Sequence, residues 1–531
     1  MRSRINMPIP RMRMPCICSH SRLLYVAKRV WLMFLVLIAC AVALSAHVGS
    51  PNVFLEGNAG PYKLFVTVRV PQVIPGIAEI EIRSESPDVT DIRIAPMQLT
   101  GPGSQYAPAA EAAARSKDDP QFFQGTLWLM EFGSLQVRIQ ADGAQGRGLL
   151  AVPIPAVAQR MLPMQRSLGL VLFALMTVLA LALVSIVAAA VREGNLAPGA
   201  VPTPARKRRV PFAAAIASLV VIGVLTLGAL WWRSDARQYA SHIYSPPEME
   251  AVVNSAGQLV LHSKSLRVAS GNPRRPASLI DFNDLMLDHE HLMHFFIIGS
   301  PGMNRFWHLH PQRAGADTFI QNLPAMPPGH YQLFADVVLN SGFPVTMLGQ
   351  IDLPSAIPGT PLTGDDSGIA AAPILTESSS AAPSGAADFA LPDGAHIIWQ
   401  RDPSPLRSGV PLALRFHVTD PAGNPAQDLQ PYMGMQAHAE IVRSDYSVFA
   451  HIHPTGSVPM ASFELAQASL PGSAAGPAAM DMANMPQMGA AKVEPDISLP
   501  YGFPQPGLYR IFIQFKRSGH IDGAFFDATV N

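Results

Sequence analysis

The stretch AHAEIVRSDYSVFAHIHP, residues 437–454, contains the pattern that decides the fold class. Apolar and polar side chains alternate on both sides of 443–447, a segment of turn-forming residues, and this pattern is typical of two strands joined as a β-hairpin. A turn centred on Asp445 and Tyr446 pairs His438 with His453 and Glu440 with His451. All four paired side chains then share one face of the sheet, whereas a slip of one residue would separate them.

A second histidine hairpin is predicted upstream. His294 lies in MHFFIIG, residues 293–299, and FWHLHP, residues 306–311, contains His308 and His310. The segment 299–304 predicts a turn that pairs His294 with His310, so that three imidazoles share one face.

The two hairpins belong to an internal duplication. FWHLHP corresponds to FAHIHP (449–454), and PPGHYQLFADVV (327–338) corresponds to QPGLYRIFIQFK (505–516). Self-similarity of this kind predicts two copies of one domain. Phe296 takes the place of Glu440 in the first copy, and the second copy carries an insertion at 465–498.

The rest of the exported chain also favours strands. Short segments rich in Val, Ile and Leu, separated by Gly, Pro and Asp, recur through 47–162, 245–355 and 390–531. This spacing predicts a mainly β protein with three β-sandwich domains. Residues 356–389 have the composition of a low-complexity linker.

Three apolar stretches predict contact with a membrane. Charged residues make up only 14% of the chain, and residues 168–191 and 210–232 are long, apolar and free of charge, as in transmembrane helices. The basic loop 192–209 between them predicts a cytoplasmic side. Residues 1–46 resemble a signal peptide, with a retained N-terminal anchor as the alternative. We therefore expect a bacterial inner membrane protein with 47–167 and 233–531 on the periplasmic side.

Charge and cysteine content exclude several function classes. The net charge is zero, but the leader holds seven basic residues and no acid, so the exported parts are acidic. An acidic surface argues against nucleic acid as a partner. The three cysteines are Cys16, Cys18 and Cys40, so no later segment can form a disulfide, a thiolate metal site or a blue-copper site.

The histidine hairpins are candidates for metal sites. Three imidazoles that converge from two strands suit Cu(II), Zn(II) or Ni(II) without a thiolate. The candidate ligands are His294, His308, His310, His438, Glu440, His451 and His453. The alternative is that these histidines are structural and hydrogen-bonded within the duplicated fold. His289 and His291 are expected to be solvated loop residues, with auxiliary metal ligands as the alternative. The segment HEHLMH is not the zinc-protease motif, because residue 293 is Met.

Two further features suggest copper. The insertion contains AMDMANMPQMG, whose Met480, Met482, Met485 and Met488 offer soft thioethers that Cu(I) prefers, although a flexible loop of biased composition is the alternative. If the leader is cleaved after Ala46, the amine and imidazole of His47 could chelate Cu(II).

Two parts of the chain resemble known families. Residues 45–83, SAHVGSPNVFLEGNAGPYKLFVTVRVPQVIPGIAEIEIR, resemble the start of YtkA-like periplasmic domains, which implies an immunoglobulin-like sandwich. The blocks around FWHLHP and FAHIHP resemble uncharacterised bacterial membrane-anchored proteins, a resemblance that implies location in the envelope and no activity.

The sequence therefore predicts a membrane-anchored metal-binding protein that handles or senses copper, with zinc as the second choice. No paired carboxylates, Ser/His/Asp order or phosphate loop occurs at a recognisable spacing, so we expect no enzyme. The expected partners are the lipid bilayer, a metal ion and other envelope proteins. The alternative is a structural or interaction protein of the envelope.

Overall fold

The structure is a computed structural model that contains two units, Met1–Ala46 and His47–Asn531. It describes residues 47–48, 52–101, 103–104, 106–197, 199–241, 243–263, 267–268, 278–279, 284–315, 317–374, 387–471 and 493–531. The predicted leader, the side chain of His47 and the four methionines of the insertion (Met480, Met482, Met485 and Met488) lie outside the described residues.

The first sandwich lies within residues 52–158, where two antiparallel sheets share one hydrophobic core. One sheet has the order β2-β3-β4-β8-β7, with β2 (Val53–Ala59), β3 (Tyr62–Arg69), β4 (Gly76–Ser84), β8 (Phe122–Leu129) and β7 (Ala114–Arg115). The other has the order β10-β9-β5-β6, with β10 (Gly146–Ala156), β9 (Gly133–Gly143), β5 (Val89–Gln98) and β6 (Glu111–Ala112).

The second sandwich contains the first histidine hairpin. Its larger sheet has the order β15-β20-β16-β17-β22, with β15 (Leu285–Met286), β20 (Gly329–Leu339), β16 (His294–Ser300), β17 (Arg305–Leu309) and β22 (Ser367–Ala370), and β21 (Pro344–Leu353) pairs with β20. The facing sheet contains β11 (Met249–Val253), β12 (Gln258–Ser263), β19 (Thr318–Asn322) and β18 (Gln312–Arg313). The short strands β13 (Arg267–Val268) and β14 (Ser278–Leu279) pair with each other.

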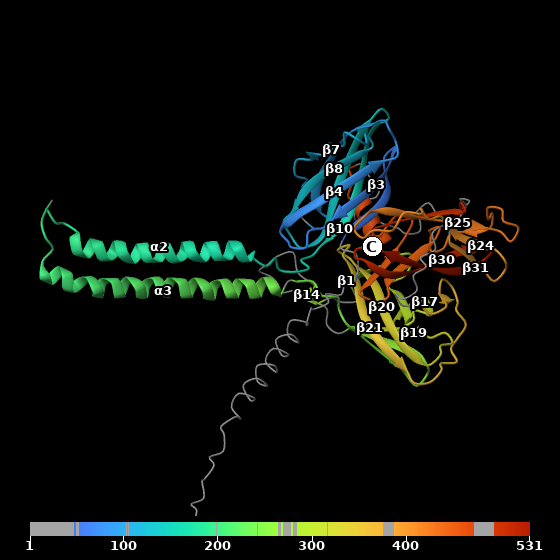
Figure 1. Ribbon diagram of the computed structural model, residues 1–531. Helices are drawn as coiled ribbons and strands as arrows, with labels where there is room; N and C mark the ends of the chain where they lie inside the picture. Colours follow the sequence, from blue (N-terminus) through green and yellow to red (C-terminus); the bar gives the residue numbers. More distant parts are fainter. Residues whose placement is uncertain are drawn as a thin grey trace, which may run out of the picture. The chain divides into compact units, whose positions relative to one another are not determined.

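The third sandwich contains the second histidine hairpin. Its larger sheet has the order β1-β28-β27-β30-β26, with β1 (His47–Val48), β28 (Val448–Ile452), β27 (His438–Arg443), β30 (Gly507–Arg517) and β26 (Leu429–Gln430), and β31 (His520–Val530) pairs with β30. The facing sheet contains β23 (Ala387–Ala390), β24 (His396–Trp399), β25 (Leu412–Thr419) and β29 (Asp496–Tyr501). The chain is therefore mainly β, with several sheets (Figure 1).

The strands of the histidine hairpins are buried on both faces, because the outer faces of the second and third sandwiches pack against each other. Successive side chains of a strand point to opposite faces. Phe295 and Ile297 accordingly belong to the core of the second sandwich, whereas Phe296 belongs to a separate cluster that also contains Phe449 and Phe512 of the third. This shared apolar cluster brings the two predicted repeats together.

The contacts between the repeats are related by a pseudo-two-fold symmetry. Phe334 stacks on Phe449, with ring centroids 4.2 Å apart, and Phe306 stacks on Phe512 at 4.4 Å. Phe306 and Phe449 occupy equivalent places in the repeats, and so do Phe334 and Phe512. Each contact is therefore the counterpart of the other, as in the isologous interface of a homodimer.

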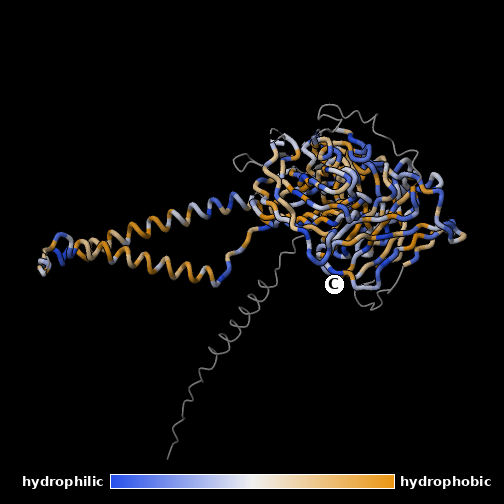
Figure 2. The backbone as a smooth tube through the Cα atoms, turned by 90° about the horizontal axis from the view of Figure 1, so that it is seen from above, coloured by the Kyte–Doolittle hydropathy of each residue, from blue (hydrophilic) through white to orange (hydrophobic). Residues whose placement is uncertain are grey.

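Two helices are long and apolar enough to cross a membrane: α2 (Arg166–Glu193) and α3 (Pro204–Ala240). None of their side chains is buried, and Figure 2 shows long apolar stretches in this helical pair together with hydrophilic segments. The predicted basic loop 192–209 is shorter in the structure. Thr203 accepts a hydrogen bond from the backbone N–H of Arg206, and Pro204 favours the first helical position, so α3 already includes the basic residues 206–209.

Two other predicted boundaries were wrong. The linker 356–389 contains β22, which adds to the edge of β17, and it ends in β23. The insertion does not begin at 465, because 460–468 form the helix α4 (Met460–Ala468), and residues 496–498 already belong to β29. Composition alone did not reveal these elements because their partners lie far away in the sequence.

Candidate metal centre

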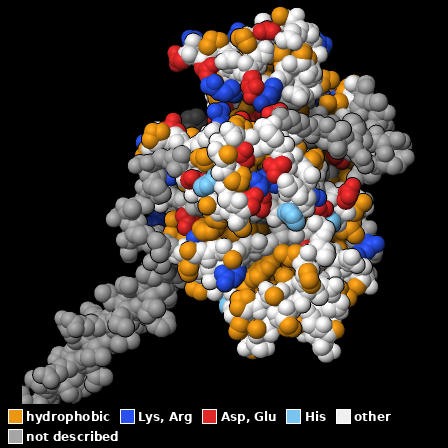
Figure 3. Space-filling model, turned by 90° about the vertical axis from the view of Figure 1, so that its right-hand side faces the viewer, with side chains coloured by type: hydrophobic (Ala, Val, Ile, Leu, Met, Phe, Trp, Pro, Cys, Tyr) orange, Lys and Arg blue, Asp and Glu red, His pale blue; other side chains and the backbone are white. Residues whose placement is uncertain are grey.

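Eight histidine rings gather where the second and third sandwiches meet. Period-two alternation directs His294 on β16 and His308 on β17 away from their own core, and it does the same for His438 on β27 and His451 on β28. The rings are those of His289, His291, His294, His308, His310, His438, His451 and His453. Each ring centroid lies within 5.0 Å of another ring centroid of the set, except that of His294, whose nearest neighbour is 5.2 Å away. On the face drawn in Figure 3, histidine side chains appear only as separate patches.

Three of these rings, His294, His308 and His451, form the first cluster, in which one atom of each lies within 4.8 Å of the others. His294 Nε2 lies 3.1 Å from the backbone oxygen of Asp288, and His308 Nδ1 lies 3.0 Å from Oε1 of Gln514. Because both oxygens accept hydrogen bonds, these two nitrogens donate and carry the protons. The other nitrogen of each ring therefore presents a lone pair.

The two lone pairs point at each other. His294 Nδ1 and His308 Nε2 are 3.1 Å apart. A metal ion with nitrogen ligands at 2.0–2.1 Å holds two adjacent nitrogens about 3 Å apart, so a cation between the rings fits this spacing. The third ring agrees, because His451 Nδ1 lies 3.6 Å from Oδ2 of Asp336 while its buried Nε2 has no hydrogen-bond partner among the described residues. Metal-bound histidines usually donate their other ring N–H to an oxygen. His294 and His308 do so, whereas His451 Nδ1 is turned toward a carboxylate at a longer distance.

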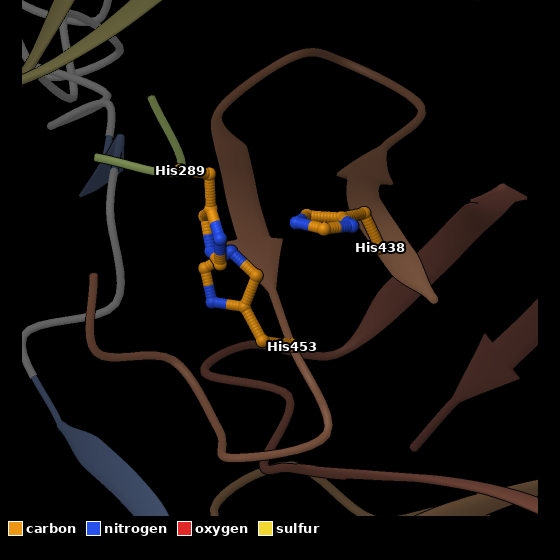
Figure 4. Close-up of side chains that lie close together, drawn as sticks. All are labelled: His289, His438 and His453. Carbon is orange, nitrogen blue, oxygen red and sulfur yellow. The ribbon is translucent and has the colours of Figure 1, made fainter. Parts of the chain in front are cut away.

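The second cluster contains His289, His438 and His453, and Figure 4 shows the three rings turned toward a common space. Their ring centroids are 4.9, 5.0 and 4.9 Å apart. Both nitrogens of His438 and of His453, together with Nε2 of His289, are buried without a hydrogen-bond partner in the described part of the chain. Each unpaired buried polar atom lowers the stability of the fold by about 1–3 kcal/mol, so the second cluster destabilises the protein unless a ligand binds there.

A tight turn supplies His289. The backbone N–H groups of Asp288 and His291 donate to each other's carbonyls, and the two residues between them, His289 and Glu290, have φ angles of 50° and 69°. The second copy repeats this turn at Tyr432–Met435, where Met433 takes the place of His289. The turn therefore directs a histidine of the first repeat toward the hairpin of the second.

Burial keeps the clustered imidazoles neutral. Burial lowers the pKa of His294 and of His451 to about 3, with like-charge repulsion from neighbouring imidazoles as the next cause. The pKa values of His308, His438 and His453 are also lowered well below the usual range, chiefly by burial. Neutral imidazole is the form that binds a metal.

Buried carboxylates surround the clusters. Burial raises the pKa of Asp336 to about 6 and raises that of Glu440 well above its usual value. Glu440 accepts a 2.6 Å hydrogen bond from Gln514, and its Oε1 lies 3.8 Å from His308 Nδ1. Burial also raises the pKa of Asp288, but nearby histidines outweigh it and the net shift is downward.

The two remaining rings form a pair beside the first cluster. His291 stacks on His310 with centroids 3.8 Å apart, and Asp366 accepts a 3.0 Å hydrogen bond from His310 Nδ1. His291 Nε2 lies 3.6 Å from Oδ2 of Asp365. Both Nε2 atoms are buried and lack a hydrogen-bond partner among the described residues.

The predicted register is confirmed in both hairpins. Glu440 pairs with His451 across β27 and β28, and Phe296 pairs with His308 across β16 and β17. The grouping of the ligands differs from the prediction, because each three-histidine cluster takes side chains from both repeats. Among the described residues, His310 and Glu440 lie beside the clusters rather than within either.

The expectation of solvated loop positions for His289 and His291 was wrong. His289 completes the second cluster, and the ring of His291 packs on that of His310. Sequence reasoning also missed Asp336, Asp365 and Asp366. The Asp365–Asp366 pair lies just before β22, in the segment predicted as a linker. For His289 the structure favours the alternative that the sequence left open, an auxiliary ligand.

Comparisons with known proteins found similarity to one domain family and to several solved structures. The profile of a domain of unknown function, DUF8832, matches residues 390–531. No curated protein matches the chain. Among solved structures, similarity extends to a tetra-tandem repeat in the extending region of a large adhesion protein (8% identity, TM-score 0.15, 87% of this chain and 72% of that chain). The FN1–FN3 domains of chicken CNTN1 are similar at 8% identity and a TM-score of 0.12, over 87% of this chain and 97% of that chain.

Proposed function

We propose that the chain is a membrane-anchored, extracytoplasmic protein that binds metal, copper in preference to zinc, and that it handles or senses the metal without catalysis. The observation that carries this proposal is the two three-histidine clusters at the interface of the repeats. In the second cluster the convergent nitrogens are buried and lack hydrogen-bond partners within the described residues. In the first cluster His451 Nε2 also lacks one, and the facing nitrogens of His294 and His308 have only each other.

A structural role for the histidines accounts for these atoms less well. Buried polar groups in folded proteins are almost always hydrogen-bonded. A structural histidine at 438 or 453 would therefore have a partner on at least one nitrogen, yet neither ring has one in the described part of the chain. The facing lone pairs of His294 and His308 would also repel each other, whereas a shared cation makes both contacts favourable.

The ligand types favour copper. Imidazole suits Cu, Zn and Ni, and the exported part of the chain contains no thiol. The methionine segment AMDMANMPQMG follows the second hairpin in sequence and supplies soft thioethers that bind Cu(I) better than Zn(II). A protein with both ligand types can hold copper in either oxidation state.

The placement in the envelope rests on the two apolar helices. α2 and α3 are long enough to span a bilayer, and basic residues at 206–209 follow the short connection between them. The positive-inside rule then places this connection in the cytoplasm and the three sandwiches outside it, in the bacterial inner membrane. The lipid bilayer and other envelope proteins are the partners of such a chain.

The test is a copper and zinc titration of the full-length chain extracted in detergent, followed by calorimetry. The variant His451→Ala/His453→Ala removes one ligand from each cluster. The matched control is His396→Ala/His417→Ala, because each of these histidines pairs with an aspartate outside the clusters.

We expect saturable binding at submicromolar concentration that the cluster variant loses and the control keeps. Circular dichroism of both variants verifies that the fold is retained. Binding that is weak and non-saturable, or equal in the two variants, would contradict the proposal and favour a structural or interaction protein of the envelope.

A further inference from the structure

The two three-histidine clusters are immediate neighbours. His451 of the first cluster and His453 of the second lie two residues apart in the chain and on the same face. Their ring centroids are 4.5 Å apart. Within the clusters, the separations between ring centroids run from 4.9 to 5.5 Å. The closest contact between the clusters is thus shorter than any contact within them.

Further ring contacts join the clusters on other sides. The centroid of His438 lies 5.6 Å from that of His451 and 6.3 Å from that of His308. The centroid of His289 lies 6.0 Å from that of His294. Every ring of the first cluster therefore contacts a ring of the second, and the six imidazoles form one continuous assembly.

The symmetry of the repeats places the first cluster at their junction. His308 and His451 are equivalent residues, and so are Gln514 and Asp336. His308 Nδ1 lies against Oε1 of Gln514, and His451 Nδ1 lies toward Oδ2 of Asp336, so the two oriented histidines are counterparts across the interface. A metal ion in the first cluster would accordingly bind His308 and its counterpart His451, together with His294 of the first repeat.

We propose that the two clusters together form one binuclear centre, with two metal ions close enough to interact, rather than two isolated sites. This inference rests on the proposed function and goes beyond it, because metal handling by itself requires only separate sites. Paired metal ions held by protein ligands are a recurrent arrangement in which the ions lie a few ångströms apart. With copper bound as Cu(II), two neighbouring unpaired electrons would couple magnetically.

The test compares bound copper with visible spins in the full-length chain. Copper is counted by atomic absorption, and spins are counted by electron spin resonance after loading with Cu(II). The variant His289→Asn removes a ligand of the second cluster, and asparagine tolerates the positive φ at this position. The variant His308→Asn removes a ligand of the first cluster.

The matched control is His291→Asn, which makes the same substitution two residues away in the same turn, outside both clusters. We expect the wild-type chain and the control to show fewer spins than bound copper ions, together with a half-field signal. Each cluster variant should lose about half of the bound copper from the clusters and show one spin per remaining ion.

Two results would overturn the binuclear centre while leaving the proposed function intact. One is a wild-type chain in which every bound copper ion contributes a full, uncoupled spin. The other is coupling that survives in both cluster variants or disappears equally in the control. If the wild-type chain binds no copper in a saturable way, the proposed function itself fails. A variant that does not fold leaves the wild-type spin count to decide.

Discussion

His438→Leu should stabilise the metal-free protein and abolish its stabilisation by metal. His438 is fully buried, and both of its ring nitrogens lack a hydrogen-bond partner in the described part of the chain. Each unsatisfied buried polar group costs about 1–3 kcal/mol. Leucine removes both polar groups and fills a similar volume, although its imperfect packing offsets part of the stabilisation. We therefore expect the free energy of unfolding to rise by about 1–3 kcal/mol.

Metal should reverse the order of stability. A ligand at a free concentration of a thousand times its Kd stabilises a folded protein by about 4.1 kcal/mol, more than the gain expected for the variant. The wild-type chain should gain this amount at the second cluster, whereas His438→Leu should not. In the presence of metal the variant should therefore no longer exceed the wild type in stability.

The assay is thermal unfolding of the full-length chain in a chelator and again in excess Cu(II). His396→Leu is the control, because it makes the same change at an exposed ring that is hydrogen-bonded to Asp388. We expect this control to change the midpoint little in either condition. If His438→Leu lowers the midpoint in chelator, the imidazole makes a stabilising contact of its own, and the reasoning from unpaired nitrogens would be refuted.

Three further predictions concern pH and the interface between the repeats. Burial lowers the pKa of His294 and of His451 from 6.5 to about 3, so between these pH values the unfolded state binds more protons than the folded state. The stability of the metal-free protein should therefore fall as the pH drops through this range. An unfolding midpoint that is independent of pH from 7 to 4 would contradict this prediction. Phe449→Ala and Phe306→Ala remove equivalent stacked rings and should each lower the free energy of unfolding by about 3–5 kcal/mol, as measured by denaturant titration; a large effect in only one of them would argue against the pseudo-symmetry. Arg510→Met removes a buried guanidinium that pairs with the exposed Asp527 and donates hydrogen bonds to two carbonyls of the second sandwich. It should cost about 1–3 kcal/mol by the same measurement, because the carbonyls lose their partner, whereas no measurable effect would show that this contact does not hold the repeats together.

Local patterns in the sequence were sufficient for the hairpins. The alternation in AHAEIVRSDYSVFAHIHP and the position of its turn specify the register, and the structure pairs Glu440 with His451 as this pattern predicts. The same reasoning held for the first hairpin, where Phe296 pairs with His308. Register is a short-range property, because it depends on the turn and on which face is apolar.

The composition of the clusters could not be predicted from local patterns. Which histidines meet depends on how the outer faces of the two repeats pack, and this packing joins residues that are far apart in sequence, such as His308 and Gln514. The apolar residues Phe296 and Phe449 on these outer faces were a signal that both faces are buried, since a solvated face would be polar there. The pair His289 and His291 was a second signal, but in the sequence a ligand and a solvated loop residue look alike.

The predicted boundaries of the linker and of the insertion were wrong because contacts with distant residues decide the structure of these segments. Residues 367–370 form a strand only because β17 offers a free edge, and residues 460–468 form a helix against the first sandwich, where Gln467 donates a 2.6 Å hydrogen bond to the carbonyl of Ala151. Neither segment has an apolar periodicity strong enough to specify its structure alone. Tertiary contacts decide such segments.

The most direct measurement is anomalous X-ray diffraction at the copper absorption edge from crystals of the full-length chain loaded with copper. The account predicts an anomalous peak bounded by nitrogens of His294, His308 and His451, and a second bounded by His289, His438 and His453. Peaks confined to histidines outside the clusters, such as His396 and His417, with both clusters empty, would contradict the claim that the interface of the repeats is a metal centre.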